Sequence, residues 1–250
     1  MKDFNDKVAI VTGGGSGIGE AIAHELAARG AKVVVADVGQ AAADRVATAI
    51  NHEGGSAISA HVDVADAASV ERMVGTAVST FGGLHLAVNN AGIGGPQANI
   101  ADYPLDGWHE VIDVNLHGVF YGMRYEIAAM LKSGGGAIVN MSSILGSVGW
   151  AGACAYVAAK HALLGLTQTA ALEYAAQKIR VNAVGPAFID TPLLSKNLDA
   201  ATLGQLAGLH PAARLGTPQE VSALTCFLLS DAASFVNGSY HLVDGGYTSR

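Results

Sequence analysis

The stretch KVAIVTGGGSGIG, residues 7–19, decides the fold. Its first half is an apolar run typical of a buried strand, and the glycines that follow it open a helix predicted over Ile18–Arg29. Glycine permits positive φ and close approach of a ligand to the backbone, and a helix N-terminus favours a pyrophosphate. The spacing of Gly13, Gly17 and Gly19 differs from the usual Gly-x-Gly-x-x-Gly dinucleotide fingerprint, so the loop alone leaves a purely structural role open.

Outward from this turn, short apolar runs alternate with longer helix-like segments. The predicted strands are Lys7–Val11, Val33–Asp37, Ala57–Val62, Leu84–Asn89, Ala137–Met141, Arg180–Val184 and His241–Val243. The further predicted helices are Ala41–Glu53, Ala67–Phe81, Trp108–Leu131, Ala153–Ala176 and Pro218–Leu229. Apolar strands joined by helices predict an α/β fold, a doubly wound parallel sheet of Rossmann type with about seven strands and helices on both faces. No repeat or linker divides the sequence, so we expect a single domain over residues 1–250.

Asp37 closes the second predicted strand, about 20 residues beyond the glycine loop. A carboxylate at this position accepts hydrogen bonds from the adenosine ribose hydroxyls of NAD and repels the 2′-phosphate of NADP. No Arg or Lys stands in the glycine loop or directly after Asp37. We therefore expect NAD as the cofactor. Two alternatives stay open at this point: Asp37 only caps the next turn, or the chain is a methyltransferase, which also combines a glycine loop with an acidic strand end.

Composition narrows the class of protein. Of the 250 residues, 50% are hydrophobic and 14% are charged, which argues against a disordered chain. A net charge of -7 without any Lys/Arg cluster argues against a nucleic-acid partner. The longest uncharged stretches are broken by glycine and asparagine, so we expect no membrane span, and the polar N-terminus has no signal-peptide pattern. Two cysteines without metal or disulfide spacing fit a reducing compartment, so we expect a cytoplasmic protein.

Two further chemistries lack their sequence pattern. His109-Glu110 has Asp113 where a zinc-binding helix needs a second histidine, so we expect no metal. The Gly-x-Ser-x-Gly turn of serine hydrolases does not occur in the sequence.

Tyr156 and Lys160 stand four residues apart in a predicted helix, which puts a phenol and an ammonium on one helical face. A phenol, with a reference pKa of about 10, is a poor base at neutral pH. A nearby cation favours the phenolate, so the pair predicts Tyr156 as a proton-transfer residue whose pKa Lys160 lowers. Such pairs also occur on exposed helical faces. The position after the fifth strand, where a doubly wound sheet binds its ligand, favours the functional interpretation.

Several spaced motifs together make the chain resemble the short-chain dehydrogenase/reductase superfamily along nearly its full length. The glycine loop has the Gly-x-x-x-Gly-x-Gly form of that family, and Tyr156 and Lys160 match its Tyr-x-x-x-Lys motif. Ser143 stands 13 residues before Tyr156, as the catalytic serine of the family does, whereas its neighbour Ser142 is expected to be structural. Asn115 matches the asparagine of the catalytic tetrad. The other matching segments are Asp63-Val64, Asn89-Asn90-Ala91-Gly92 and Val243-Asp244-Gly245-Gly246.

The resemblance implies a division of labour at the site. Ser143 would bind the substrate oxygen and Tyr156 would exchange its proton. Lys160 would lower the pKa of the tyrosine and bind the nicotinamide ribose, and Asn115 would hold a water on a proton path to solvent. Cofactor contacts are implied for Gly13, Ser16, Gly17, Ile18, Gly19, Asp37, Asp63, Val64, Asn90, Gly92, Tyr156, Lys160, Pro186, Ile189 and Thr191.

This set of residues favours an oxidoreductase that interconverts a secondary alcohol and a ketone over a methyltransferase. It also disfavours the remaining alternative, a nucleotide-sensing or scaffold protein built on the same fold. The resemblance further implies a homotetramer.

One departure from the family pattern is Pro186-Ala187, where Pro-Gly is usual. Alanine lacks the freedom of glycine at positive φ, so we expect the start of the nicotinamide-proximal loop to differ. Ile189 and Thr191 still fit the carboxamide contacts of the family.

The segment 187–214 follows the sixth strand without a strand pattern, and we expect it to cover the substrate as a loop or lid. Its basic residues, Lys196 and Arg214, are expected to be solvated. The apolar residues expected to line the pocket are Phe188, Leu193, Leu194, Leu198 and Leu203, with Gly94-Gly95, Ile144 and Trp150 from other segments. The predicted substrate is a small, neutral, fairly apolar secondary alcohol or ketone, cyclic ones included.

Overall fold

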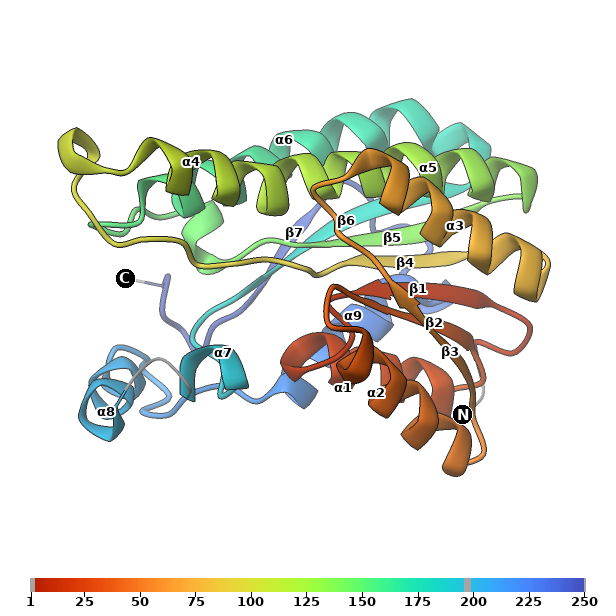
Figure 1. Cartoon of the computed structure of the whole chain (residues 1–250), viewed down its shortest axis with the longest axis horizontal. Coiled ribbons are helices and arrows are strands. Elements are labelled where there is room, and N and C mark those ends of the chain that lie inside the picture. Colours follow the sequence, from red (N-terminus) through yellow and green to blue (C-terminus); the bar gives the residue numbers. More distant parts are fainter. Residues whose placement is uncertain (1–2, 196–198, 250) are drawn as a thin grey trace.

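The computed structural model of the chain describes residues 3–195 and 199–249. Within these residues, seven strands form one parallel sheet in the order β3-β2-β1-β4-β5-β6-β7, with helices on both faces (Figure 1). The predicted fold class is therefore confirmed. The strands are β1 (Val8–Thr12), β2 (Lys32–Asp37), β3 (Ser56–His61), β4 (Leu86–Asn89), β5 (Gly136–Met141), β6 (Ile179–Pro186) and β7 (Tyr240–Val243).

The order of the strands reverses beside β1. The chain runs from β1 outward to β2 and β3 and then returns to β4 on the other side, so Val11 pairs with both Val35 and Val88. Every residue of β1 is buried, which explains its continuous apolar sequence. A doubly wound sheet opens a crevice at such a switch point, outside the carboxyl ends of its strands. The residues predicted after β1, β4 and β5 therefore belong to one edge of the sheet.

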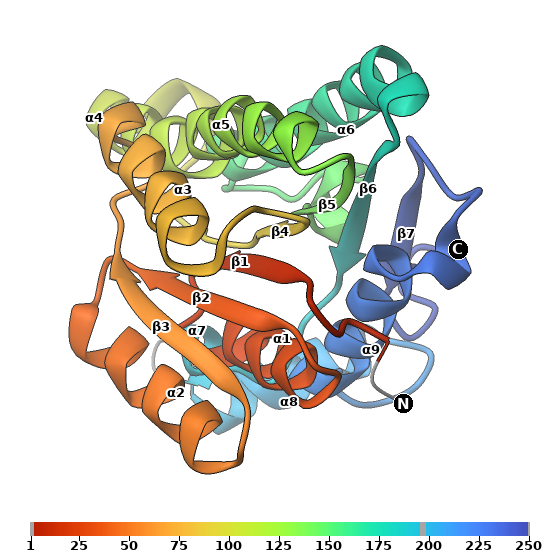
Figure 2. The same cartoon turned by 90° about the vertical axis from the view of Figure 1, so that its right-hand side faces the viewer.

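Helices α1, α2 and α9 cover one face of the sheet, and α3, α5 and α6 cover the other (Figure 1 and Figure 2). Each face has its own apolar core, with Leu26 and Val46 in the first and Met73 and Leu163 in the second. None of the helices in the described part of the chain is long and apolar enough to cross a membrane. The helices are α1 (Gly17–Ala28), α2 (Gln40–His52), α3 (Ala67–Phe81), α4 (Leu105–Ile112), α5 (Gly118–Lys132), α6 (Cys154–Tyr174), α7 (Pro192–Ser195), α8 (Ala200–Gly208) and α9 (Pro218–Leu229).

The prediction of one helix over Trp108–Leu131 is wrong in two respects. The helical segment begins earlier, at Leu105 directly after Pro104, and a π-helical turn, Asp113–His117, separates α4 from α5. A π turn holds an additional residue, which changes the direction of the side chains that it carries, and such turns are frequent at functional sites. This turn carries Asn115.

The segment 187–214 is more regular than its sequence predicts, because it contains α7 and α8. Helix α8 begins at a capping residue, Asp199, whose carboxylate accepts a hydrogen bond from the backbone N–H of Thr202 at 2.8 Å. Gly204 and Gly208 weaken the helical pattern in the sequence. Lys196 and Leu198, which the sequence analysis named in this segment, lie outside the described residues. The side chain of Leu193 is also outside the described part of the structure.

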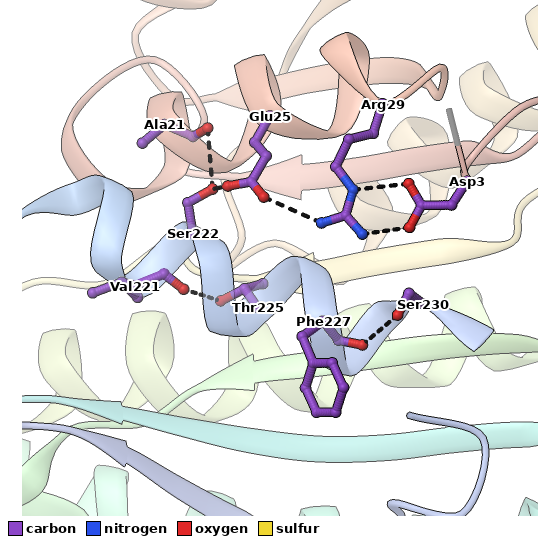
Figure 3. A network of polar contacts seen from close by, with 9 residues as sticks. All are labelled: Asp3, Ala21, Glu25, Arg29, Val221, Ser222, Thr225, Phe227 and Ser230. Atoms are coloured by element: carbon purple, nitrogen blue, oxygen red, sulfur yellow. Dashed lines mark hydrogen bonds and ion pairs between the residues drawn. The ribbon is translucent and has the colours of Figure 1, made fainter. Parts of the chain in front are cut away.

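A polar network ties the N-terminal segment to α1 and α9 (Figure 3). Arg29 donates from Nε to Asp3 Oδ1 at 2.9 Å and from Nη1 to Glu25 Oε1 at 3.2 Å. The hydroxyl of Ser222 on α9 donates to the other carboxylate oxygen of Glu25. We call these four residues the Asp3–Ser222 network. It joins the first and last large helices of the chain through paired charges.

Candidate active site

Ser143, Tyr156 and Lys160 come together at the carboxyl end of β5. Ser143 follows this strand, and its Oγ accepts a hydrogen bond from the N–H of Leu145 at 3.2 Å, which fixes the turn after the strand. Tyr156 and Lys160 lie one turn apart in α6, with Nζ of the lysine 5.5 Å from the ring centroid of the tyrosine. The Ser143 side chain lies close enough to the Tyr156 phenol to act on the pKa of that phenol. The arrangement gives a phenol one neighbour that can bind an oxygen and another that carries a charge.

Burial controls the ionisation of this pair. Removal of the phenol from water raises the pKa of Tyr156, and its hydrogen bond with Ser143 acts in the opposite direction. Burial also lowers the pKa of Lys160 to about 8. Desolvation of the phenolate thus dominates the pKa of Tyr156, and the lowering effect expected of Lys160 stays a prediction. A lysine that holds its proton weakly suits a group that passes protons on.

Lys160 is held by the backbone of β5. Its Nζ donates to the carbonyl oxygen of Met141 at 2.7 Å, and the side chain is almost completely buried. No carboxylate of the described residues forms an ion pair with it. Ser142 donates from its hydroxyl to the Lys160 carbonyl oxygen at 3.0 Å, which confirms its predicted structural role.

Asn115 uses its whole amide to fix the chain after β4. Its Nδ2 donates to the carbonyl oxygen of Ile93 and its Oδ1 accepts from the N–H of Ile93, both at 2.8 Å. A Cβ at Gly92 would lie 3.1 Å from Asn115 Oδ1 and 3.6 Å from Lys160 Nζ. The π turn, the segment after β4 and Lys160 are therefore close neighbours, and glycine at position 92 leaves them room.

The glycine loop needs its glycines at the predicted positions. Gly13 and Gly17 have φ of 63° and 55°, and a Cβ on Gly19 would lie 2.1 Å from the Gly13 carbonyl oxygen. Ser16 precedes α1 in an extended conformation, and its side chain caps none of the described first-turn N–H groups. Ile18 packs against the core under α1. The N–H groups at the start of α1 thus remain available to an anion, which fits a dinucleotide pyrophosphate.

Asp37 lies directly beside this loop. Its Oδ2 accepts from the N–H of Gly15 and its Oδ1 accepts from the N–H of Gly39, each at 2.9 Å. The hydrogen bond from Gly39 caps the turn after β2, which is the alternative role of Asp37 that the sequence left open. Each carboxylate oxygen can accept more than one hydrogen bond, so capping and ribose binding are compatible.

The sequence did not indicate Arg45, which α2 brings to the same loop. Its guanidinium donates to the Gly15 carbonyl oxygen at 2.9 Å and to both carboxylate oxygens of Glu20 at 2.7 and 2.8 Å. Arg45 stands eight positions after Asp37, so a search for cations directly after that residue misses it. Its charge is paired with Glu20.

Asn90 joins the end of β4 to the glycine loop. Its Nδ2 donates to the carbonyl oxygens of Thr12 at 2.9 Å and Gly13 at 3.3 Å. After β3, Asp63 accepts from the N–H of Ala65 at 2.9 Å, and Val64 is buried.

The loop after β6 crosses to the glycine loop. A Cβ on Gly17 would lie 3.3 Å from the Thr191 methyl group, while Ile189 is buried. The backbone of Ala187 donates to the Val243 carbonyl oxygen at 3.1 Å, directly after Pro186 pairs with Val243. Ala187 does not have a positive φ, so alanine fits this position without strain.

The residues expected to line a substrate pocket are only partly brought together. Trp150 and Phe188 make an edge contact with ring centroids 5.6 Å apart. Ile144 is wholly buried in the interior, so it does not face an open pocket. Arg214 is exposed, as predicted, and pairs with Glu220 at 2.6 Å.

Comparison with known proteins decides the family. A family model described as enoyl-(acyl carrier protein) reductase matches residues 13–248. The chain is 50% identical over 247 residues to the cyclohexanol dehydrogenase of Acinetobacter sp. (strain SE19), with 99% of this chain and 97% of that protein covered. The chain belongs to the short-chain dehydrogenase/reductase family.

Two further comparisons agree with this family assignment. The cis-4-hydroxycyclohexanecarboxylate dehydrogenase of Sinomonas cyclohexanicum is 46% identical over 246 residues, covering 98% of each chain. The crystal structure of levodione reductase has a TM-score of 0.95 and 35% identity, with 98% of this chain and 99% of that one covered. This member of the short-chain dehydrogenase/reductase family is an oxidoreductase acting on CH–OH groups, which removes the methyltransferase and the sensor or scaffold protein as alternatives.

Proposed function

We propose that this chain is an NAD-dependent dehydrogenase that interconverts an alicyclic secondary alcohol and its ketone, with Tyr156 as general acid and base. The observation that carries the proposal is the Tyr156 phenol, whose pKa responds to the Ser143 side chain and whose ring centroid lies 5.5 Å from Lys160 Nζ. Two relatives are named as dehydrogenases of cyclohexanol and of cis-4-hydroxycyclohexanecarboxylate. These names support a ring as the apolar part of the substrate. The edge contact of Trp150 with Phe188 offers an apolar wall for such a ring.

The glycine loop and the ends of β2, β3, β4 and β6 would hold the cofactor. NAD supplies the hydride acceptor in oxidation and, when reduced, the hydride donor. Asp37 accepts hydrogen bonds from the ribose hydroxyls and repels a 2′-phosphate, while the pairing of Arg45 with Glu20 leaves little charge for that phosphate. The other proposed contacts are Gly13, Ser16, Gly17, Ile18, Gly19, Asp63, Val64, Asn90, Gly92, Tyr156, Lys160, Pro186, Ile189 and Thr191.

The protein contributes orientation and proton transfer. The Ser143 hydroxyl binds the substrate oxygen. The Tyr156 phenolate accepts the proton of the alcohol in oxidation, and the phenol returns it to the ketone oxygen in reduction. The Lys160 ammonium stabilises the phenolate and binds the nicotinamide ribose, and Asn115, fixed through Ile93, holds a water that continues the path to solvent.

We further propose a single domain over residues 1–250 with 187–214 as the substrate-covering lid, in a cytoplasmic homotetramer with no nucleic-acid partner. Exposed apolar side chains support contacts between copies: Phe120 and Leu131 of α5 are 46% and 44% exposed, and Leu172 of α6 is 86% exposed. Light scattering that finds only monomer would refute the tetramer.

Replacing Tyr156 tests the central proposal. Cyclohexanol with NAD is expected to produce NADH at a rate that falls about a thousandfold or more in Tyr156→Phe, because the proton has no acceptor. Fluorescence titration should find NADH binding nearly unchanged, since the ring remains. NADP should support turnover only weakly. Near-normal turnover of the variant would refute the role of Tyr156, and NADH binding without turnover of any alcohol by the wild-type protein would refute the reaction.

A further inference from the structure

Four aromatic side chains from separate segments form a chain at the carboxyl end of β6 and β7. Phe188 contacts Trp150, His210 and Tyr247, with ring centroids 5.6, 5.8 and 6.0 Å apart, and His210 also contacts Tyr247 at 5.7 Å. We call these four residues the aromatic cluster. It joins the loop before Tyr156 to the end of the lid and to the C-terminal segment.

His210 is the polar member of the aromatic cluster that lacks its full set of partners. The residue is 4% exposed, and its Nδ1 lies 3.0 Å from the Leu206 carbonyl oxygen. A carbonyl only accepts, so Nδ1 carries a proton, and in the neutral form of the ring Nε2 then offers a lone pair. None of the described residues donates to Nε2. A buried acceptor without a donor is costly, so its persistence indicates a group that binds there.

A small cavity lies beside the aromatic cluster and shares Phe188 and His210 with it. It has a volume of about 90 Å³, and its lining includes Ala187, Phe188, Ile189 and His210. The charged groups around it are already occupied: Arg214 pairs with Glu220, and the Asp244 carboxylate accepts from the N–H groups of Gly246 and Thr248 at 3.0 and 2.9 Å. Of the described lining, this leaves His210 Nε2 as the buried side-chain atom without a partner.

The cavity is lined by Ala187, Phe188 and Ile189 of the loop after β6, and Phe188 contacts Trp150 of the loop before Tyr156. We propose that His210 is a specificity-determining residue that accepts, through Nε2, a hydrogen bond from a second hydroxyl at the far end of the ring substrate. The aromatic cluster holds the ring while Ser143 and Tyr156 hold the reacting oxygen. The inference rests on the proposed function and narrows its substrate class to ring diols. A carboxylate at the same ring position has no proton for Nε2.

Kinetics with three probes test this inference: 1,4-cyclohexanediol, cyclohexanol and 4-hydroxycyclohexanecarboxylate. The wild-type protein should turn over the diol with a kcat/KM about tenfold above the values for the other two, since only the diol can donate to Nε2. In His210→Phe, which keeps an aromatic ring, the value for the diol should fall about tenfold while that for cyclohexanol stays within about twofold. His210→Gln, which offers an amide oxygen, should regain much of the preference for the diol.

The control variant is His52→Phe, at the exposed end of α2, which should behave as wild type on all three probes. Equal losses on diol and cyclohexanol in both His210 variants would overturn the inference while leaving the proposed function intact. A wild-type preference for the carboxylate that disappears in His210→Phe would overturn it too, since His210 would then act as a cation. If the wild-type protein turned over none of the probes, the proposed function would fail with it.

Discussion

The site at the end of β5 holds a buried cation and the Asp3–Ser222 network a partly buried one, and the pKa values of the two cations shift in opposite directions. Arg29 lies between the carboxylates of Asp3 and Glu25, which raise its pKa. Lys160 has a backbone carbonyl as its partner, and burial lowers its pKa to about 8. Pairing with carboxylates fixes a charge, whereas burial without them leaves it ready to change. We expect this contrast to distinguish a structural cluster from a functional one.

Among the variants that test this comparison, Lys160→Met has the largest expected effect. We expect kcat for alcohol oxidation to fall about 100- to 1,000-fold, because the phenolate loses its nearby cation. The free energy of unfolding should not fall, because the variant removes a buried charge that lacks a carboxylate partner. Steady-state kinetics and urea unfolding measure the two quantities. A large loss of stability with normal kcat would show that Lys160 is a structural cation and would contradict the comparison.

Glu126 sharpens the comparison, because it is a buried carboxylate with one partner. Its Oε2 accepts from Asn89 Nδ2 at 3.0 Å, its Oε1 has no partner among the described residues, and burial raises its pKa to about 7. The folded state thus binds the proton more tightly than the unfolded chain, so the wild type loses stability as pH rises from about 4.5 to 7, by about 3 kcal/mol in all.

Glu126→Gln should remove most of this pH dependence and unfold at higher urea concentration than wild type above pH 7. Unfolding curves at several pH values measure the difference. Parallel pH profiles for the two proteins would show that the carboxylate titrates normally in the folded state.

Of the variants Lys160→Met, Glu126→Gln and Arg29→Met, the last should have the smallest effect. In contrast to Lys160→Met, it should lower stability and leave kcat unchanged. The ion pairs of Arg29 are partly exposed, so we expect a loss of about 1–2 kcal/mol of unfolding free energy. The kcat should stay near the wild-type value, because the network does not touch the site. High salt should reduce the difference in stability. A variant that kept full stability but lost activity would show that the network belongs to the site.

The sequence predicts most of the architecture, because apolar runs mark the strands and glycines mark the ends of α1, α2 and α3. The glycine loop and the Tyr156–Lys160 pair are visible since their spacing is local. The structural role expected of Ser142 agrees with its hydrogen bond to the Lys160 carbonyl oxygen, while the catalytic role of Ser143 stays a prediction.

What the sequence did not predict depends on contacts between distant segments. The π turn around Asn115 keeps an apolar pattern close to that of an α-helix, so periodicity does not reveal the additional residue. The approach of Arg45 to the glycine loop and the unpartnered Nε2 of His210 arise only when helices pack. The direction of the Tyr156 pKa shift follows from burial, which a four-residue spacing does not report.

The contact between Glu25 and Ser222 spans 197 residues of the chain. During synthesis at about 5–20 residues per second, α1 therefore waits about 10–40 s before α9 emerges to cover it. Throughout that interval the nascent chain presents the uncovered side of α1 and the sheet, which is a surface for chaperones. Ribosome pausing late in the message would lengthen this exposure.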